Sequence, residues 1–230
     1  MRFGVLQFPG SCDDRDALAA AGRVGDAELL WHGERALKGA EAIIVPGGFS
    51  YGDYLRAGAI ARFSPVMESV IAFANDGGLV LGICNGFQVL CEAHLLPGAL
   101  LGNANRRFTF RQLSLEVVNA DTAFTCACAR NRRSASKRLS IPAKHSWGRY
   151  YAEPGTLQAM EEAGQVVLRY ESEQNFNGSL NDIAGVCNEA GNVFGLMPHP
   201  EHAVDELTGG SADGLEIFES MRLAVEGVRA

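Results

Sequence analysis

The sequence predicts an α/β protein built on a doubly wound, mostly parallel sheet, with an antiparallel extension in the second half of the chain. In the first half, short apolar runs alternate with helical patterns, as in parallel sheets that helices cover on both faces. In the second half, β-type runs follow one another with little helix between them. A cysteine between two glycines interrupts the apolar run 79–90, at the point where a strand gives way to a helix.

The elements of the first half are marked by changes in the apolar pattern. Pro9-Gly10 ends the first apolar run, and capping residues then precede Leu and Ala at helical spacing. A glycine-rich loop over 46–53 follows the third apolar run, and the next helical pattern surrounds Pro65. The predicted elements are strands at 3–8, 27–32, 42–45 and 79–83, helices at 13–21 and 57–75, and a helix directly after Cys84 in a unit that closes at Leu96-Pro97-Gly98.

The elements of the second half are mostly strands. The polar stretch 188–192 reads as a turn between two of them. The last helix, over 211–228, offers a core-facing stripe of apolar residues: Leu215, Phe218, Met221, Leu223 and Val225. The predicted strands are 113–118, 166–170, 183–187 and 193–197.

Length and composition favour one domain, spanning residues 1–230. A chain of 230 residues with 47% hydrophobic and 20% charged residues is long enough to bury a full core. The formal net charge of -7 argues against a general nucleic-acid binder. The apolar run 3–8 is too short for a signal peptide, and no apolar run reaches membrane-spanning length. We therefore expect neither a nucleic-acid partner nor a membrane partner.

Six cysteines are scattered along the chain without the density of a disulfide framework, which is typical of the reducing cytoplasm. Two of them, Cys126 and Cys128, stand close together, but their spacing is wrong for zinc and no partner pair follows. We therefore predict a cytoplasmic protein with no metal site.

One basic stretch stands out in an otherwise acidic chain. It is read as a solvated surface loop, because small and polar residues separate its charges. It has no interleaved aromatic residues, so contact with an anionic partner surface is favoured over nucleic-acid binding. The basic residues are Arg130, Arg132, Arg133, Lys137 and Arg138.

The run from Leu79 to Leu90 has the form of a nucleophile elbow. A buried strand would deliver Cys84 to its carboxyl end, and Gly82 and Gly86 have no Cβ to crowd a sharp strand-to-helix turn. The sulfur would then lie over the first amides of a helix, whose partial positive charge favours a thiolate. A buried, inert cysteine is the commoner fate of a free thiol. The flanking glycines favour the reactive interpretation.

A cysteine nucleophile needs a base, and histidine suits that task near neutral pH. His199 is the strongest candidate, because it follows an apolar strand and is held between two prolines that restrict the backbone. Glu201, two residues on, would orient the imidazole. His32, His94 and His202 are interpreted as structural, with His202 near enough in sequence to support the site.

A tetrahedral intermediate on Cys84 also needs hydrogen-bond donors for its oxyanion. The amide of Asn85 would lie at a helix N-terminus, next to the nucleophile. The loop Gly47-Gly48-Phe49 follows another strand end and could bring a second N–H close, because glycine permits a tight backbone approach. A plain strand-ending turn is the alternative for this loop.

Together these segments resemble the class I, triad-type glutamine amidotransferases, a family with a flavodoxin-like fold. The resemblance lies in Gly82-Ile83-Cys84-Asn85-Gly86 and in His199-Pro200-Glu201, which match the family's Gly-x-Cys-x-Gly and His-Pro-Glu motifs. The long run over 46–61 and the segment Asn85-Gly86-Phe87-Gln88 are more specific. They are similar to the glutaminase subunits that serve a synthetase of purine biosynthesis, and the similarity covers essentially the whole chain.

The resemblance implies an activity and a set of partners. Cys84 would attack the side-chain amide of glutamine, His199 would act as base and then acid, and Glu201 would orient it. Gly47, Gly48, Phe49, Asn85 and Gln88 would bind the oxyanion or the substrate. The ammonia would pass to a large synthetase subunit that uses ATP and Mg²⁺, and a small accessory subunit would complete the complex. No cofactor is expected in this chain, where the loop over 46–53 lacks the ending of a phosphate-binding loop.

The chain departs from the family pattern in two places. It has Ser11-Cys12-Asp13-Asp14 where such subunits read Asn-Cys-Asp, and Lys144-His145-Ser146-Trp147-Gly148 where they read Ala-His-Gly-Glu-Gly. The second segment would shape the surface near the glutamine pocket, so we expect substrate positioning or partner signalling to differ there.

Three other interpretations stay open at this point. The chain could be a class I glutaminase that serves a different synthetase, or a cysteine hydrolase of the related flavodoxin-like proteins. It could also be a regulatory or scaffolding subunit without catalysis. Replacing Cys84 by serine separates the last of these from the enzymes, because a scaffold would be indifferent to the change.

Overall fold

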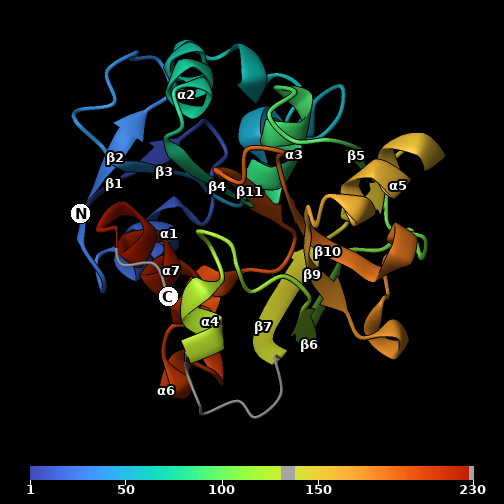
Figure 1. Cartoon of the computed structure of the whole chain (residues 1–230). Coiled ribbons are helices and arrows are strands. Elements are labelled where there is room, and N and C mark those ends of the chain that lie inside the picture. The colour runs from blue at the N-terminus through green and yellow to red at the C-terminus, as the bar shows by residue number, and fades with distance from the viewer. Residues whose placement is uncertain (131–137, 228–230) are drawn as a thin grey trace.

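The computed structural model describes residues 1–130 and 138–227 (Figure 1). Its main sheet has nine strands in the order β2-β1-β3-β4-β11-β10-β9-β6-β7. A separate two-stranded sheet pairs β5 with β8. The strands are β1 (Arg2–Gln7), β2 (Asp26–Trp31), β3 (Ala42–Val45), β4 (Leu79–Ile83), β5 (Ala99–Leu101), β6 (Thr109–Val117), β7 (Arg138–His145), β8 (Arg149–Tyr151), β9 (Val166–Tyr170), β10 (Ile183–Cys187) and β11 (Val193–Leu196).

The pairing directions confirm the predicted fold class. The five strands β2, β1, β3, β4 and β11 pair in parallel, and the strands β10, β9, β6 and β7 extend the sheet in antiparallel pairs. The central parallel strands β3, β4 and β11 are short and almost fully buried, because helices cover both of their faces, whereas the edge strand β2 is partly exposed. All strands of the parallel part therefore place their carboxyl ends at one edge of the sheet.

Helices flank the parallel strands on both sides. Figure 1 shows α2 and α3 on one side of these strands and α1 and α7 on the other. The α-helices are α1 (Asp14–Ala21), α2 (Pro65–Asn75), α3 (Asn85–Glu92), α4 (Cys126–Arg130), α5 (Pro154–Glu162), α6 (Glu206–Gly209) and α7 (Leu215–Val225). Short 3-10 turns lie at Ser50–Asp53, Ala61–Phe63, Ser172–Gln174, Leu180–Asp182 and Pro200–His202. None of the described helices is long and apolar enough to cross a membrane.

The predicted helix over 57–75 is wrong in its first half. A short 3-10 turn occupies Ala61–Phe63, and the α-helix begins only at Pro65. Proline has no backbone N–H and disfavours a helical conformation in the residue before it, so Ser64 is extended, with ψ of 143°. Pro65 therefore starts the helix instead of lying inside it.

The last helix is also shorter than predicted. It runs over Leu215–Val225, where Phe218 and Met221 of the expected stripe are fully buried and Leu215 is only partly buried. A separate short helix, α6, precedes it, and Asp205 caps α6 by accepting bonds from the amides of Leu207 and Thr208. The helix after Cys84 ends at Glu92, ahead of the segment Leu96-Pro97-Gly98 at which this unit was expected to close.

The second half contains more helix than the sequence suggested. The helix α5 connects β8 to β9, and its start at Pro154 is a position where proline is favoured. The basic stretch lies largely at 131–137, outside the described residues, so the loop prediction for it stays a prediction. Arg138, its last member, begins β7 and forms an ion pair with Glu171 at 3.0 Å.

Candidate active site

Cys84 lies between β4 and α3 in a backbone conformation that is rare for a residue with a side chain. Its φ is 50° and its ψ is -103°, and only 6% of its surface is exposed. Glycine is required on both sides, because a Cβ on Gly86 would collide with the carbonyl of Val45 and one on Gly82 would lie 2.5 Å from Leu90. Such strain is stored where a site needs a fixed geometry. The structure therefore has the elbow that the sequence predicted.

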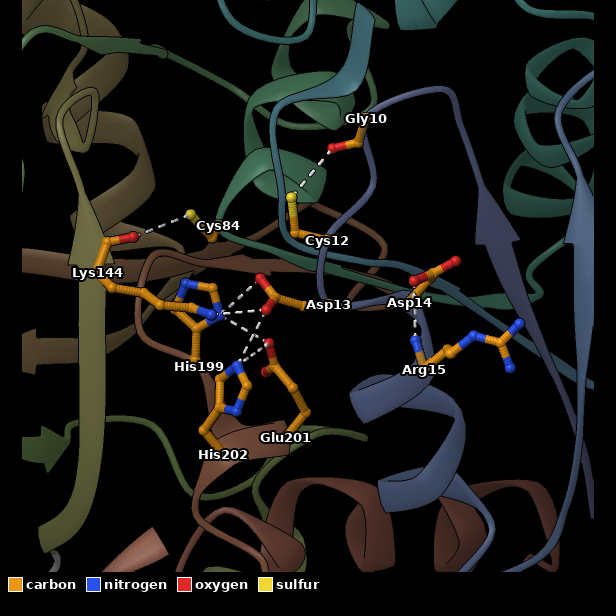
Figure 2. Close-up of polar contacts among 10 residues, drawn as sticks. All are labelled: Gly10, Cys12, Asp13, Asp14, Arg15, Cys84, Lys144, His199, Glu201 and His202. Atoms are coloured by element: carbon orange, nitrogen blue, oxygen red, sulfur yellow. Dashed lines mark hydrogen bonds and ion pairs between the residues drawn. The ribbon is translucent and has the colours of Figure 1, made fainter. Parts of the chain in front are cut away.

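The adjacent strand β11 delivers His199 and Glu201 to the same edge of the sheet. β11 pairs in parallel with β4, and Leu196 lies opposite Ile83, so the residues after both strands meet. His199 Nδ1 contacts Glu201 Oε1 at 2.6 Å, and both side chains are buried. Figure 2 shows the His199 imidazole between Glu201 and the side of the site that carries Cys84.

The unpartnered Nε2 atom of His199 and the raised pKa of its ring suit a base for Cys84. His199 Nε2 has no hydrogen-bond partner among the described residues. Burial lowers the pKa of His199, because it opposes a charge on the ring. The Glu201 carboxylate and the Cys84 sulfur have the larger effect and raise this pKa well above its ordinary value. The imidazole is therefore a strong proton acceptor in this environment.

The loop after β3 packs directly against the histidine. A Cβ on Gly47 would lie 2.5 Å from Asp13 Oδ2 and 2.8 Å from His199 Cε1, so a larger residue does not fit. Gly48 has a φ of 141°, and a Cβ there would lie 2.5 Å from the amide of Cys12. This close approach of backbone to the site is what the glycine pair provides.

Of the backbone amides of Gly48, Phe49 and Asn85, two are available as oxyanion donors and one already donates to a backbone carbonyl. The amide of Asn85 is the first of α3 and has no intrahelical acceptor. The amide of Gly48 donates to no backbone acceptor within the described residues. The amide of Phe49 donates to Gly10 at 2.9 Å, so only the Phe49 side chain, which lines the pocket, faces the substrate space.

The side chains of Asn85 and Gln88 organise the walls of the site. Asn85 Oδ1 accepts from the amide of Ser50 at 3.0 Å, and its Nδ2 donates to Gln88 at 2.9 Å and to Asp53 at 3.2 Å. Gln88 Nε2 donates in turn to the carbonyl of Trp147. These bonds connect α3 to the loop over 50–53 and to the segment after β7.

A cavity of about 140 Å³ opens over Cys84. Of the predicted site residues, Gly48, Phe49, Cys84, Gln88 and His199 line it, while Gly47, Asn85 and Glu201 do not. The unusual segment at 144–147 forms part of the wall, in keeping with the place near the pocket that the family resemblance implied for it. The other lining residues are Cys12, Asp13, Asp53, Phe108, Lys144, His145, Ser146 and Trp147.

Asp13, Lys144 and His202 form a charged network beside the triad that the sequence reasoning missed (Figure 2). Asp13 is 4% exposed and contacts Lys144 Nζ at 2.6 Å and His202 Nε2 at 3.1 Å. It also lies 3.6 Å from His199 Nδ1. Burial alone would raise the pKa of Asp13. The hydrogen bond from His202 and the charges of His199 and Lys144 outweigh burial and hold this pKa well below its ordinary value.

The position of Asp13 in the sequence could have indicated that it lies near the site. Asp13 follows the carboxyl end of β1, which lies at the same sheet edge as the ends of β3 and β4. The sequence predicts that Asp13 caps the helix that follows it, but its side chain makes no capping bond to α1. Its carboxylate points at His199 instead.

Asp13, His199, Glu201 and His202 also have the donor atoms for a divalent cation. One ligand atom from each lies within 4.8 Å of the others. The ammonium of Lys144, 2.6 Å from Asp13, already supplies a positive charge at this cluster. A metal ion would compete with that ammonium and with the proton of the imidazole.

Comparison with known proteins points in one direction. A family model described as "CobB/CobQ-like glutamine amidotransferase domain" matches residues 1–221. Phosphoribosylformylglycinamidine synthase subunit PurQ of Rubrobacter xylanophilus is 58% identical over 222 residues, covering 96% of this chain and 97% of that protein. The protein of the same name from Corynebacterium efficiens is 55% identical, over 95% of this chain and 96% of its own length.

Comparison with solved structures gives the same result as comparison with sequences. A chain in the structure of PurLQS from Thermotoga maritima superposes with a TM-score of 0.86 at 42% identity, covering 97% of this chain and 98% of that one. A putative GMP synthase subunit from Thermoplasma acidophilum has a TM-score of 0.64 at 14% identity, with 99% and 94% covered. The second likeness shows the fold alone.

Proposed function

Because the chain belongs to the CobB/CobQ-like glutamine amidotransferase family, we propose that it is the glutaminase subunit of a phosphoribosylformylglycinamidine synthase and uses Cys84, His199 and Glu201 as its triad. The chain and its relatives of that name align over at least 95% of this chain. That coverage also supports a single amidotransferase domain over residues 1–230.

The first half-reaction forms a thioester. Cys84 Sγ attacks the carboxamide carbon of glutamine, and the thiol proton goes to His199 Nε2, whose charge Glu201 balances across the ring. The carbonyl oxygen becomes an oxyanion that the amides of Gly48 and Asn85 stabilise. When the C–N bond breaks, His199 Nε2 returns the proton to the leaving nitrogen, and ammonia departs.

The second half-reaction releases glutamate. A water molecule gives a proton to His199 Nε2 and attacks the thioester carbon. The same two amides stabilise the second tetrahedral intermediate. Collapse breaks the C–S bond, and the proton on His199 returns to the Cys84 sulfur. The sum of both steps is one glutamine and one water converted to one glutamate and one ammonia.

The ammonia is consumed by a partner. We propose that a large synthetase subunit uses it, with ATP and Mg²⁺ bound in that subunit, to convert formylglycinamide ribonucleotide to the amidine of purine biosynthesis. A small accessory subunit completes the complex. The similar Thermotoga maritima chain comes from a structure named for an assembly, PurLQS, which supports this arrangement. Six free cysteines support a reducing, cytoplasmic location for the complex.

One observation carries the proposal: a strained cysteine at the end of β4 shares a pocket with His199, which follows the neighbouring strand β11 and is paired with the buried Glu201. An inert structural cysteine would need neither the strain nor the unpartnered His199 nitrogen beside it. A scaffolding subunit without catalysis would explain the fold but would not explain the strained backbone of Cys84 or the unpartnered nitrogen of His199.

Replacing Cys84 by serine tests the triad in the assembled complex. Glutamine-dependent synthesis of the amidine should fall by at least 10³-fold, on the scale of other lost catalytic nucleophiles. Synthesis from added ammonium salt should stay within about two-fold of the wild type, because the partner subunit performs that step. If the serine variant keeps glutamine-dependent synthesis, the chain is a scaffold and the proposal is wrong. If the wild-type complex uses ammonia but never glutamine, this chain serves a different synthetase.

A further inference from the structure

The pocket over Cys84 contains two carboxylates, and only one of them is paired with a cation. Asp13 is paired with the ammonium of Lys144 and also contacts His202. Asp53 has no ion pair with any described residue. Among the described residues, its single side-chain hydrogen bond comes from the neutral side chain of Asn85, at 3.2 Å. Asp53 is therefore the unbalanced negative charge of the pocket.

The environment of Asp53 favours binding a cation. The side chain is half-buried in the wall that also contains Cys84 and Gln88. Burial raises the pKa of Asp53 to about 6, and the hydrogen bond from Asn85 offsets only part of that effect. A positively charged group in the pocket would remove this penalty and hold the carboxylate in its ionised form.

The backbone holds Asp53 in place at a cost. Tyr51, Gly52 and Asp53 have φ values of 52°, 69° and 53°, a run of left-handed conformations that is unfavourable for residues with side chains. The Tyr51 hydroxyl anchors the run through His32 Nδ1 and Ser64 Oγ, each at 2.8 Å. A structure that keeps such strain has a fixed position for the side chain that the turn presents.

We propose that Asp53 binds the α-ammonium group of glutamine and so selects the free amino acid over other carboxamides. This inference rests on the proposed glutaminase function. Glutamine is a zwitterion whose ammonium lies at the opposite end from the carboxamide that Cys84 attacks. Asp53 and Cys84 line the same cavity and come from different elements, which lets one substrate contact both. Asp53 is thus a specificity residue and takes no part in the bond changes.

The test compares two substrates in two proteins, each assembled with its partner subunits. The substrates are glutamine and glutaramate, the monoamide of glutaric acid, which lacks only the α-ammonium group. The variant is Asp53→Asn, which keeps an acceptor for Asn85 and loses the charge. Glu68→Gln serves as the control, because it removes one negative charge from an exposed pair with Arg35, away from the pocket.

The measured quantity is the ratio of kcat/KM for glutamine to kcat/KM for glutaramate. The wild type and Glu68→Gln should prefer glutamine by about 10- to 100-fold, the range expected for hydrogen bonds to charged groups. Asp53→Asn should lose most of this preference through its KM for glutamine, while ammonia-dependent synthesis, which the partner subunit performs, stays unchanged. A variant that keeps the wild-type ratio overturns the inference, as does a wild type without preference. A wild type inactive on both carboxamides refutes the proposed function instead.

The pH dependence of the wild-type ratio gives a second measurement if Asp53→Asn folds poorly. The other titratable groups that line the pocket are Cys12, Asp13, Cys84, Lys144, His145 and His199. Catalytic protonations affect both substrates alike and cancel in the ratio. Asp53 is ionised above its pKa and neutral below it, so the preference for glutamine should decline as the pH falls through about 6. A ratio that is constant between pH 5 and 8 contradicts the inference.

Discussion

Lys144 contacts the candidate active site at two points. Its backbone carbonyl accepts from the Cys84 thiol at 3.9 Å, and its ammonium lies 2.6 Å from Asp13 Oδ1. Asp13 is almost fully buried, so the ammonium balances a charge that water does not reach. This residue occupies the segment that departs from the family pattern, and its side chain replaces an alanine there. The departure thus adds a cation to the site.

Replacing Lys144 by methionine should destabilise the chain. The apolar stem is kept while the charge is lost, which leaves the buried Asp13 carboxylate with only histidine partners. We expect the free energy of unfolding to fall by about 1–3 kcal/mol, the cost of an unsatisfied buried polar group. Urea denaturation at pH 7.5 measures it. Lys38→Met is the matched control, because the pair of Lys38 with Glu28 is exposed and should contribute less than about 1 kcal/mol. Equal losses in both variants would contradict this view of Lys144.

At the scale of elements, one side chain joins the elbow helix to the strained turn. Asn85, at the start of α3, accepts from the amide of Ser50 and donates to Asp53 and Gln88. The turn Ser50–Asp53 has a second anchor in the Tyr51 hydroxyl. The position of the proposed specificity residue therefore depends on a helix that follows it by some thirty residues.

Replacing Asn85 by alanine should affect both stability and substrate binding. The buried amide of Ser50 loses its acceptor, which costs about 1–3 kcal/mol in the free energy of unfolding. The KM for glutamine should rise, because the Asp53 carboxylate loses the hydrogen bond from Asn85. Asp205→Ala, which removes the N-cap of α6, should cost about 1 kcal/mol and leave the KM unchanged. Thermal unfolding and glutaminase kinetics on both variants separate the effects, and an unchanged KM in Asn85→Ala would refute the anchoring role.

Element boundaries show what local pattern predicts well. The strands β3, β4, β9 and β10 begin and end at the predicted residues, because short apolar runs bounded by turns are distinctive. The prediction of a helix over 57–75 was wrong in its first half, because the apolar spacing continues through Pro65, which starts the observed helix. Helix α5 was missed since it is largely polar and only Met160 of it is buried.

At the scale of the whole molecule, the parallel sheet assembles the site. The ends of β1, β3, β4 and β11 bring together Asp13, the Gly47-Gly48 pair, Cys84 and His199 from positions far apart in the chain. The antiparallel extension adds the wall: β7 ends at His145, next to the pocket segment that contains Trp147. The parallel part of the fold thus positions Cys84 and His199, the proposed nucleophile and base, and the antiparallel part closes the pocket.

A buried histidine in that extension should make the stability of the molecule depend on pH. Asn103 Nδ2 donates to two carbonyls, so Asn103 Oδ1 is the acceptor and His145 Nδ1 is the donor at 3.0 Å. Burial, with a smaller contribution from the charge of His199, lowers the pKa of His145 to about 3. Between pH 6.5 and 3 the unfolded chain binds a proton there and the folded chain does not, so acid favours unfolding.

The measurement compares the wild type with His145→Gln in urea at pH 7.5 and pH 5. The wild type should lose about 2 kcal/mol more than the variant over this interval, from about 1.4 kcal/mol for each pH unit below 6.5. Asp53, whose pKa is raised, acts in the opposite direction, but it is present in both proteins and cancels. Parallel losses in the two proteins would show that His145 takes up its proton in the folded state as well.

The sequence alone determined the fold class, the position of Cys84 at a strand-to-helix elbow, and His199 as the proposed base. These depend on local features: apolar runs of strand length, glycines beside Cys84, and prolines around His199. Only the tertiary structure decided what surrounds them. Asp13, Asp53 and Lys144 are ordinary polar residues in the chain. Their roles come from burial, from strain in the turn at Asp53, and from strands that meet at one edge of the sheet, all of which depend on contacts between distant segments.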